Sequence, residues 1–160
     1  MPCYLFTFHA YQSWMPDRKK GFVRRKKGIL PPDKQMANIY KKQAKQSKIL
    51  FSVVVQKLLL EEFSLVCRMQ RLRAHYISTE PTHVHVLVSW DDDRSWFVIR
   101  NGIKTSFSRR LNKEESQRTW FSSGASRKRV KDQAHFDYLI TQYLPSHLGW
   151  QWQEGKIPFR

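Results

Sequence analysis

The residues most suited to chemistry are two histidines separated by one valine. His83 and His85 lie in a run of valine and leucine that ends near Trp90. Because side chains alternate faces along a strand, both imidazoles are expected on one side and Val84 on the other. Imidazole binds transition metals well, so the pair predicts a divalent-ion site if a third ligand arrives from elsewhere in the chain. The alternative is that two polar residues occupy the wetter face of a half-exposed strand.

A second candidate group lies in a helix predicted from Asp132 to about His147. At about 100° per residue, the apolar stripe of this helix contains Tyr143, which is therefore assigned to the core. Tyr138 lies on the opposite, polar face, with Gln142 one turn further along. An exposed phenol beside a carboxamide is expected of a nucleophile with a neighbouring ligand. The alternative is an ordinary surface tyrosine.

Together these groups predict a site for phosphoryl transfer. A divalent ion, Mg²⁺ or Mn²⁺, held by His83, His85 and Gln142 would polarise a phosphate and offset its developing charge. Tyr138 would attack that phosphate, forming a 5′-phosphotyrosine and releasing a 3′-hydroxyl. Because the ester keeps its energy, attack by another hydroxyl rejoins the strand without ATP.

The elements that must position these groups alternate along the chain. The order β-α-β-β-α-β-α is that of the split βαβ, ferredoxin-like fold. This is an α+β sandwich with helices on one face of an antiparallel sheet, plus a C-terminal helix that carries Tyr138. At 160 residues the chain is expected to form one domain over 1–160. Strands are predicted over 3–11, 72–79, 83–90 and 119–122, and helices over 52–70, 95–112 and 132–147.

The charge balance points to a polyanionic partner. Lys and Arg number 29 against 13 Asp and Glu, a formal net charge of +16. Nucleic acid is the expected partner, because neutralising phosphates releases counterions, and a merely soluble basic protein or a ribosome-associated one is the alternative. A basic loop insertion is predicted at about 17–48 and a second basic loop at 124–131. The predicted DNA-binding residues are Arg24, Arg25, Lys26, Lys27, Arg100, Lys104, Arg109, Arg110, Arg127, Lys128 and Arg129.

Aromatic and cysteine residues add two weaker expectations. Trp14, Trp150 and Trp152 would either stack on unpaired bases or belong to the core. Cys3 and Cys67 form no CxxC pair, so neither a disulfide framework nor a thiolate zinc site is indicated.

The sequence shows no signal-peptide pattern and no apolar run long enough for a transmembrane helix, which favours the cytoplasm.

Four segments resemble the HUH single-tyrosine transposases, in particular their REP-associated tyrosine transposase branch. Residues 4–11 look like the family's first strand, and residues 81–88, Pro-Thr-His-Val-His-Val-Leu-Val, look like its Pro-Asn-His-x-His-hydrophobic signature. Residues 103–112 resemble the family's Lys-x-x-Phe-Ser-Arg-x-x-Asn segment. Residues 138–142 match its Tyr-x-x-x-Gln pattern.

The resemblance implies a metal-dependent enzyme that nicks and rejoins single-stranded or hairpin DNA in the bacterial cytoplasm, associated with the nucleoid. Tyr138 would be the nucleophile, and His83, His85 and Gln142 would be the metal ligands. A monomer is favoured, with a homodimer as the alternative. The 17–48 segment is longer and more basic than the compact transposases need.

Two other interpretations of the same motifs stay open. One is a non-catalytic, ferredoxin-like module that binds nucleic acid, which explains the charge and the fold but leaves the histidine pair without a role. The other is a host-adopted transposase that keeps hairpin binding and has lost mobility.

Overall fold

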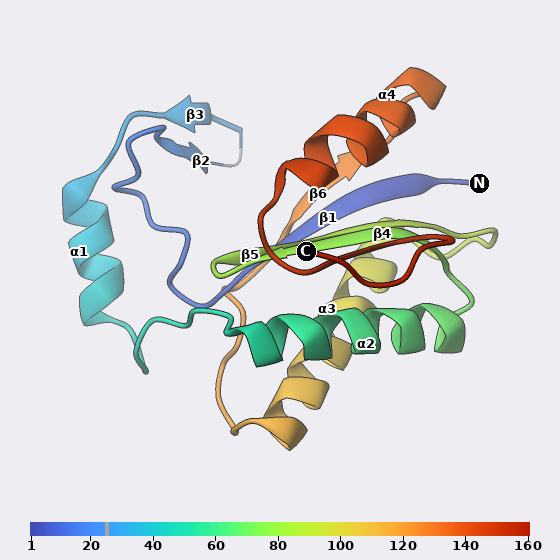
Figure 1. The fold of residues 1–160 in the computed structure, drawn as a ribbon. Coiled ribbons are helices and arrows are strands. Elements are labelled where there is room, and N and C mark those ends of the chain that lie inside the picture. Colours follow the sequence, from blue (N-terminus) through green and yellow to red (C-terminus); the bar gives the residue numbers. More distant parts are fainter. Residues whose placement is uncertain (25) are drawn as a thin grey trace.

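Strands and helices alternate along the chain much as the sequence predicts (Figure 1). The computed structural model describes residues 1–24 and 26–160, so Arg25, one of the predicted DNA-binding residues, lies outside the described residues. None of the described helices combines the length and the apolar character that a membrane span requires. In chain order the elements are β1 (Cys3–His9), β2 (Phe22–Arg24), β3 (Gly28–Leu30), α1 (Lys34–Lys42), α2 (Val53–Met69), β4 (Arg73–Glu80), β5 (His83–Ser89), α3 (Trp96–Glu114), β6 (Ser126–Arg129), α4 (Gln133–Tyr138), the π-helical turn η1 (Leu139–Tyr143), the 3-10 turn η2 (Leu144–Ser146) and β7 (Gln151–Gln153).

The main sheet of the described residues has five strands in the order β6-β1-β5-β4-β7. β1 lies antiparallel to β5 and β6, and β4 lies antiparallel to β5 and β7. Without the short edge strand β7, this is the spatial order of a βαββαβ unit, whose last strand lies beside its first. The predicted α+β, ferredoxin-like class is confirmed.

Different helices cover the two faces of this sheet. Because side chains alternate along β1, Phe6 and Phe8 pack with α2 and α3, whereas Leu5 packs with the last helix. Figure 1 shows α2 and α3 below the sheet and α4 above it. The upper cluster includes Leu139 and Leu144 from the turns that follow α4. The predicted shared face therefore holds for α2 and α3, and the last helix lies on the opposite face.

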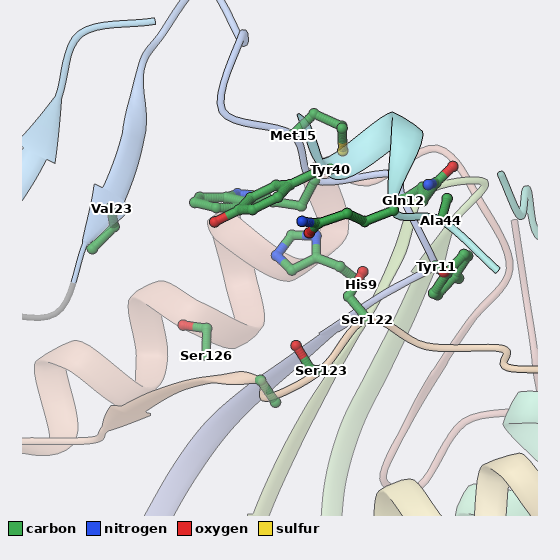
Figure 2. A pocket seen from close by; sticks show the side chains of 13 residues that line it. His9, Tyr11, Gln12, Met15, Val23, Tyr40, Ala44, Ser122, Ser123 and Ser126 are labelled. Atoms are coloured by element: carbon green, nitrogen blue, oxygen red, sulfur yellow. The ribbon is translucent and has the colours of Figure 1, made fainter. Parts of the chain in front are cut away.

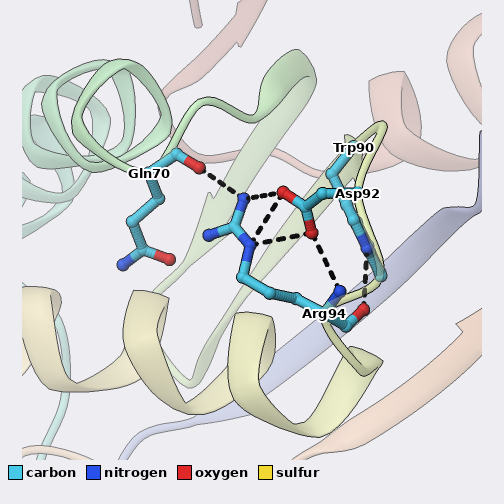
Figure 3. Close-up of polar contacts among 4 residues, drawn as sticks. All are labelled: Gln70, Trp90, Asp92 and Arg94. Atoms are coloured by element: carbon cyan, nitrogen blue, oxygen red, sulfur yellow. Dashed lines mark hydrogen bonds and ion pairs between the residues drawn. The ribbon is translucent and has the colours of Figure 1, made fainter.

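Side-chain caps and one arginine fix the two helices of the lower face. Ser52 caps α2 and Ser95 caps α3, each accepting a hydrogen bond from a backbone amide three residues ahead. Arg94 pairs with Asp92 through Nη2 and Oδ2 at 2.6 Å and donates to the carbonyl oxygen of Gln70 at 2.7 Å (Figure 3). This arrangement ties the end of α2 to the start of α3.

The last strand of the ferredoxin-like unit is not where the sequence predicts it. The expected strand over 119–122 contributes only an isolated bridge between Phe121 and Ala10. The strand that joins the sheet is β6, inside the predicted second basic loop, and all four of its residues are exposed. Its sequence, Ser-Arg-Lys-Arg, has no apolar residue, so hydrophobic periodicity could not reveal it. Backbone hydrogen bonds to β1 hold it at the edge.

The last helix changes its winding part-way, and the prediction of one α-helix over 132–147 is wrong in its second half. α4 passes into the π-helical turn η1 and then into η2. The amide of Leu144 donates to the carbonyl oxygen of Leu139, five residues back, and Pro145 has no N–H with which to continue the helix. Despite the change in winding, Tyr143 packs on the sheet-facing side with Phe136 and Ile140, as the α-helical wheel predicts.

The basic segment at 17–48 contains more structure than the predicted loop. β2 and β3 form a small hairpin in which Phe22 pairs with Leu30. α1 follows it and begins at Asp33, whose Oδ1 accepts from the Met36 amide at 2.8 Å. In Figure 1 this hairpin and helix lie beside the end of the sheet where β4 turns into β5. The insertion therefore stands next to the predicted histidine site.

Candidate active site

His83 and His85 lie on β5 and share one face of the sheet, as the alternation predicts. His85 is opposite Thr7 of β1, and His83 is opposite His9. Thr7 Oγ1 lies 2.7 Å from His85 Nδ1, and Thr82 Oγ1 lies 2.9 Å from His83 Nδ1. Each hydroxyl holds one ring nitrogen and leaves Nε2 for another partner. Histidines that bind metals are commonly oriented in this way.

A third imidazole comes from the residue after η2. One ligand nitrogen from each of His83, His85 and His147 lies within 4.8 Å of the others. His147 Nδ1 lies 3.0 Å from the carbonyl oxygen of Leu144. A carbonyl oxygen only accepts hydrogen bonds, so Nδ1 carries the proton and Nε2 of the neutral ring keeps its lone pair. The three rings thus converge with a nitrogen lone pair available on His147.

Tyr143 brings a hydroxyl to the same cluster. Its phenolic oxygen lies 3.5 Å from His85 Nε2, and its ring centroid is 5.2 Å from that of His147. The ring packs against the apolar cluster around Leu5, but the side chain also lines the cavity in front of the histidines. Tyr143 therefore packs against the core, as predicted, and also belongs to the histidine site.

The electrostatic environment keeps the phenol protonated and the imidazoles neutral. Burial, and then the neighbouring Tyr138, raise the pKa of the Tyr143 hydroxyl above its ordinary value. Burial also lowers the pKa of His83 to about 4 and that of His85 to about 2, and the neighbouring imidazoles add to both shifts. At neutral pH the histidines therefore present lone pairs rather than charges.

A cavity of about 490 Å³ gives access to this cluster. His9, Trp14 and Arg18 line it together with the histidines, and Ser126 enters from β6. Burial and the nearby Arg18 lower the pKa of His9 to about 4. Arg18 therefore brings positive charge to the cavity, which favours an anionic occupant such as a phosphate.

The donor set fits a divalent transition-metal ion. Three imidazoles form a common ligand set for catalytic metals, and three protein ligands leave a coordination position for substrate. Imidazole suits Mn²⁺ less than it suits Zn²⁺ or Co²⁺, and Mg²⁺ prefers oxygen ligands. The residues therefore fit the predicted class of metal, with transition metals favoured over Mg²⁺.

Two predicted site residues lie outside this cluster. Tyr138 is 46% exposed on α4, and its ring centroid is 6.4 Å from that of Tyr143. Gln142 is exposed on η1 and does not line the cavity among the residues that the structure describes. The structure thus brings Tyr143 and His147, rather than Tyr138 and Gln142, up to the histidine pair.

The sequence did not predict His147 or Thr7 as site residues. His147 follows Tyr143 by four positions, the spacing that also separates Tyr138 from Gln142. The pattern tyrosine-x-x-x-ligand therefore occurs twice in the last helix. The second occurrence was not predicted as a site because the α-helical wheel assigned Tyr143 to the core. Finding Thr7 requires the register of β1 against β5, for which a single sequence has no signal.

The predicted DNA-binding residues divide into exposed cations and cations already engaged. Lys104 Nζ donates to two carbonyl oxygens of the 122–124 loop at 2.5 and 2.7 Å, so its ammonium holds that loop. Arg110 pairs with Glu61 at 3.0 Å, and Arg100 packs over two aromatic rings of α3. The exposed members are Arg24, Lys26, Lys27, Arg109, Arg127, Lys128 and Arg129. Among them, Arg127 also packs over the Trp96 ring, 3.8 Å from its centroid.

No protein-family model and no curated protein matches the sequence. Several solved structures resemble the chain. One is a REP-associated tyrosine transposase bound to a REP hairpin, at 10% identity and a TM-score of 0.49, covering 87% of this chain and 62% of that one. Another is a candidate transposase from Deinococcus radiodurans R1, at 11% identity and a TM-score of 0.49, covering 93% of each chain. This chain spans less than two thirds of the first structure's length.

Proposed function

We propose that the protein is a metal-dependent, single-tyrosine enzyme that nicks and rejoins single-stranded DNA, with Tyr143 as its nucleophile. The position of the Tyr143 hydroxyl, 3.5 Å from His85 Nε2 within a group of three imidazoles, supports this most directly. Tyr138, the nucleophile implied by the family resemblance, is the alternative, and its ring lies next to that of Tyr143.

His83, His85 and His147 would hold the divalent ion, each through one imidazole nitrogen. When bound, a divalent cation supplies Lewis acidity that offsets negative charge on a reacting phosphate. The hydroxyl of Thr7 and the carbonyl of Leu144 each hold the second ring nitrogen of a histidine. These contacts orient the ligands before substrate arrives, which reduces the reorganisation needed for the reaction.

Tyr143 would act on a phosphate in the cavity. Its oxygen forms a bond to phosphorus while the bond from phosphorus to the 3′ oxygen breaks. The strand downstream of the break stays on the tyrosine through its 5′ phosphate, and the upstream strand leaves with a free 3′-hydroxyl. The phenolic proton passes to solvent, and solvent returns a proton to the leaving oxygen. Attack by another 3′-hydroxyl reverses the exchange and rejoins DNA.

The basic edge of the sheet would guide the strand to this site. Ser126, the first residue of β6, lines the histidine cavity. Arg127, Lys128 and Arg129 follow it and are exposed. Because such side chains bind phosphates whatever the base sequence, they would position single-stranded DNA without selecting it. By the family resemblance, the proposed substrate contains a hairpin and the protein works as a monomer in the bacterial cytoplasm.

Covalent trapping tests the proposal. The protein is incubated with labelled single-stranded hairpin DNAs in Mn²⁺ or in EDTA, and a denaturing gel is inspected for a protein–DNA adduct. We expect a band that requires the metal and disappears in Tyr143→Phe. Tyr138→Phe is the matched control, because it removes a neighbouring phenol from the same helix.

Other outcomes of the same experiment reassign the function. A band that survives Tyr143→Phe and is lost in Tyr138→Phe returns the nucleophile to Tyr138. Binding without any covalent band, over all metals and hairpins, favours the non-catalytic or host-adopted nucleic-acid-binding module.

A further inference from the structure

A second, larger cavity of about 810 Å³ opens beside the histidine cavity. The two share His9, Trp14 and Ser126 in their walls. The larger cavity is built from the end of β1, from α1 and from the segment before β6. Figure 2 shows Tyr40 and His9 near each other, with Ser122, Ser123 and Ser126 below them and Val23 to the left. A DNA strand with one phosphate in the histidine cavity would thus bring the adjoining nucleotide to this second cavity.

Three aromatic residues contribute to the lining. Tyr11, Trp14 and Tyr40 all contribute, and Tyr40 remains 48% exposed. Trp14 is held by an edge contact to Phe22 at 6.5 Å between centroids and by the Arg18 guanidinium 5.8 Å from its ring. The indole of Trp14 and the exposed phenol of Tyr40 both line this cavity, so their flat faces are available for stacking.

The rest of the lining mixes apolar side chains, such as Met15 and Val23, with uncharged polar ones. Gln12 and Gln43 offer carboxamides, and Ser122 and Ser123 offer hydroxyls. No Asp, Glu, Lys or Arg is among the described residues that line it. Gln12 also has a backbone φ of 60°, the left-handed region that residues other than glycine seldom adopt. Such a lining suits a flat, uncharged ring with polar edges better than it suits a phosphate.

The exposed cations lie around this cavity rather than in it. Val23 of the β2–β3 hairpin lines it, while the adjoining Arg24 is exposed. Lys26 and Lys27 continue the same hairpin and are also exposed. Cations outside and neutral rings inside are the combination by which proteins bind single strands, with phosphates held at the rim and bases stacked on aromatic side chains.

We propose that this cavity binds an unpaired nucleobase next to the phosphate that the histidine site acts on, with the base stacked on Tyr40 and Trp14. The inference rests on the proposed function for its substrate class. It gives the insertion at 17–48 a role, because α1 supplies Tyr40 and the hairpin supplies Val23. The carboxamides of Gln12 and Gln43 would then meet the polar edge of the base.

Equilibrium binding to a short labelled oligodeoxythymidylate in EDTA tests the stacking. A base-free oligonucleotide of the same length and charge is the second probe. Loss of one stacked base typically weakens binding roughly 5- to 150-fold. We expect Tyr40→Ala to weaken the thymidylate by that factor and to leave the base-free strand unchanged, while Tyr40→Phe restores binding. Ile39→Ala is the matched control, because Ile39 is exposed on the same helix and does not line the cavity.

The result that overturns the proposal is equal weakening of both probes, or no weakening of either, in a folded Tyr40→Ala variant. Photocrosslinking to an oligonucleotide that carries 5-iodouracil gives an independent check. Crosslinked peptides should contain Tyr40, Trp14 or Tyr11, and crosslinks confined to other surfaces, such as that of Trp150, would contradict the proposal.

Both measurements are made without metal and without strand cleavage, so they separate this inference from the proposed reaction. If Tyr40 binds the base and no phosphotyrosine ever forms, the base site stands and the enzyme proposal fails. If the adduct forms and Tyr40→Ala has no effect on binding, the enzyme proposal stands and the base site fails.

Discussion

The two faces of the main sheet are built from the same strands but from different chemistry. On the lower face, Phe6 and Phe8 of β1 and Val84 and Val86 of β5 are fully buried against α2 and α3. On the upper face the residues between them are polar, and Thr7 and His85 are paired there by a hydrogen bond. One face is a continuous apolar core, and the other is a small apolar cluster with a polar cavity beside it.

The difference shows how the fold separates stability from chemistry. Alternation lets a single strand supply core residues to one side and ligands to the other, so changes on one face need not disturb the other. The short, irregular last helix leaves part of the upper face open, whereas α2 and α3 close the lower one. Stability should therefore depend mainly on the lower face, and metal binding on the upper.

The largest effect is expected from Phe107→Ala on the lower face. Phe107 is fully buried and packs edge-on against Phe8 at 5.9 Å between centroids. Removing a buried phenylalanine costs about 3–5 kcal/mol of folding free energy. Denaturant unfolding should show this loss, while the folded fraction binds Mn²⁺ as the wild type does. The separation of the faces is refuted if the same change abolishes metal binding in protein that is still folded.

His147→Ala on the upper face should remove the stabilisation that metal gives. A ligand present at 100 times its Kd stabilises the native state by about 2.7 kcal/mol. We expect that gain in the wild type on addition of Mn²⁺ or Zn²⁺, and we expect its loss in His147→Ala. Gln142→Ala is the control and should keep the gain. Thermal unfolding with and without metal measures both, and the opposite pattern would restore Gln142 as the third ligand.

Thr7→Val removes the hydroxyl that holds His85 and keeps His85 itself, so it tests whether this contact contributes to metal binding. Valine has nearly the same shape but cannot hold His85 Nδ1, so the ring loses its fixed orientation. Changes of this kind typically weaken metal binding about 10- to 100-fold. Titration calorimetry with Mn²⁺ gives the affinity. Ser126→Ala, which alters the same cavity without touching an imidazole, should bind metal normally, and equal losses in both variants would argue against an orienting role for Thr7.

The smallest predicted effect concerns His75, which is buried at the far end of the upper face. Its Nε2 lies 2.8 Å from Ser89 Oγ, and Phe136 and Glu154 face its ring. Burial lowers the pKa of His75 below its ordinary 6.5, although Glu154 opposes the shift. The unfolded chain therefore binds a proton more readily, so this contribution to stability is complete above pH 6.5 and is lost as the pH falls below it.

In metal-free protein, His75→Gln should reduce the slope of stability against pH below 6.5. One proton corresponds to at most about 1.4 kcal/mol per pH unit. Urea unfolding at a series of pH values between neutral and mildly acidic gives the slope. An unchanged slope would mean that His75 does not titrate differently in the folded state.

Much of the fold follows from local patterns in the sequence. Ser52 begins α2 as its position before an amphipathic run predicts, and the stripe of Ile99, Ile103 and Phe107 is buried on α3. These elements are recognisable because burial imposes a period on them. β6 has no such period, because it is an edge strand of exposed polar residues that pairs with β1 through its backbone.

Only those features of the site that depend on local strand or helix geometry could be predicted from the sequence. The shared face of His83 and His85 follows from strand alternation alone. The helical wheel places Tyr143 and His147 on one stripe and Tyr138 opposite it, and the structure keeps that division. A wheel does not show, however, that the stripe meets His83 and His85 on β5, because that contact depends on tertiary packing.

The division of the site between the sheet and the η turns also has a consequence for synthesis. A ribosome adds roughly 5–20 residues per second, so β1 and β5 emerge seconds before Tyr143. During that interval the nascent chain carries the paired histidines without Tyr143 and His147. If the proposed function holds, the growing polypeptide is unable to cut DNA near its own site of translation until η1 and η2 have folded onto the sheet.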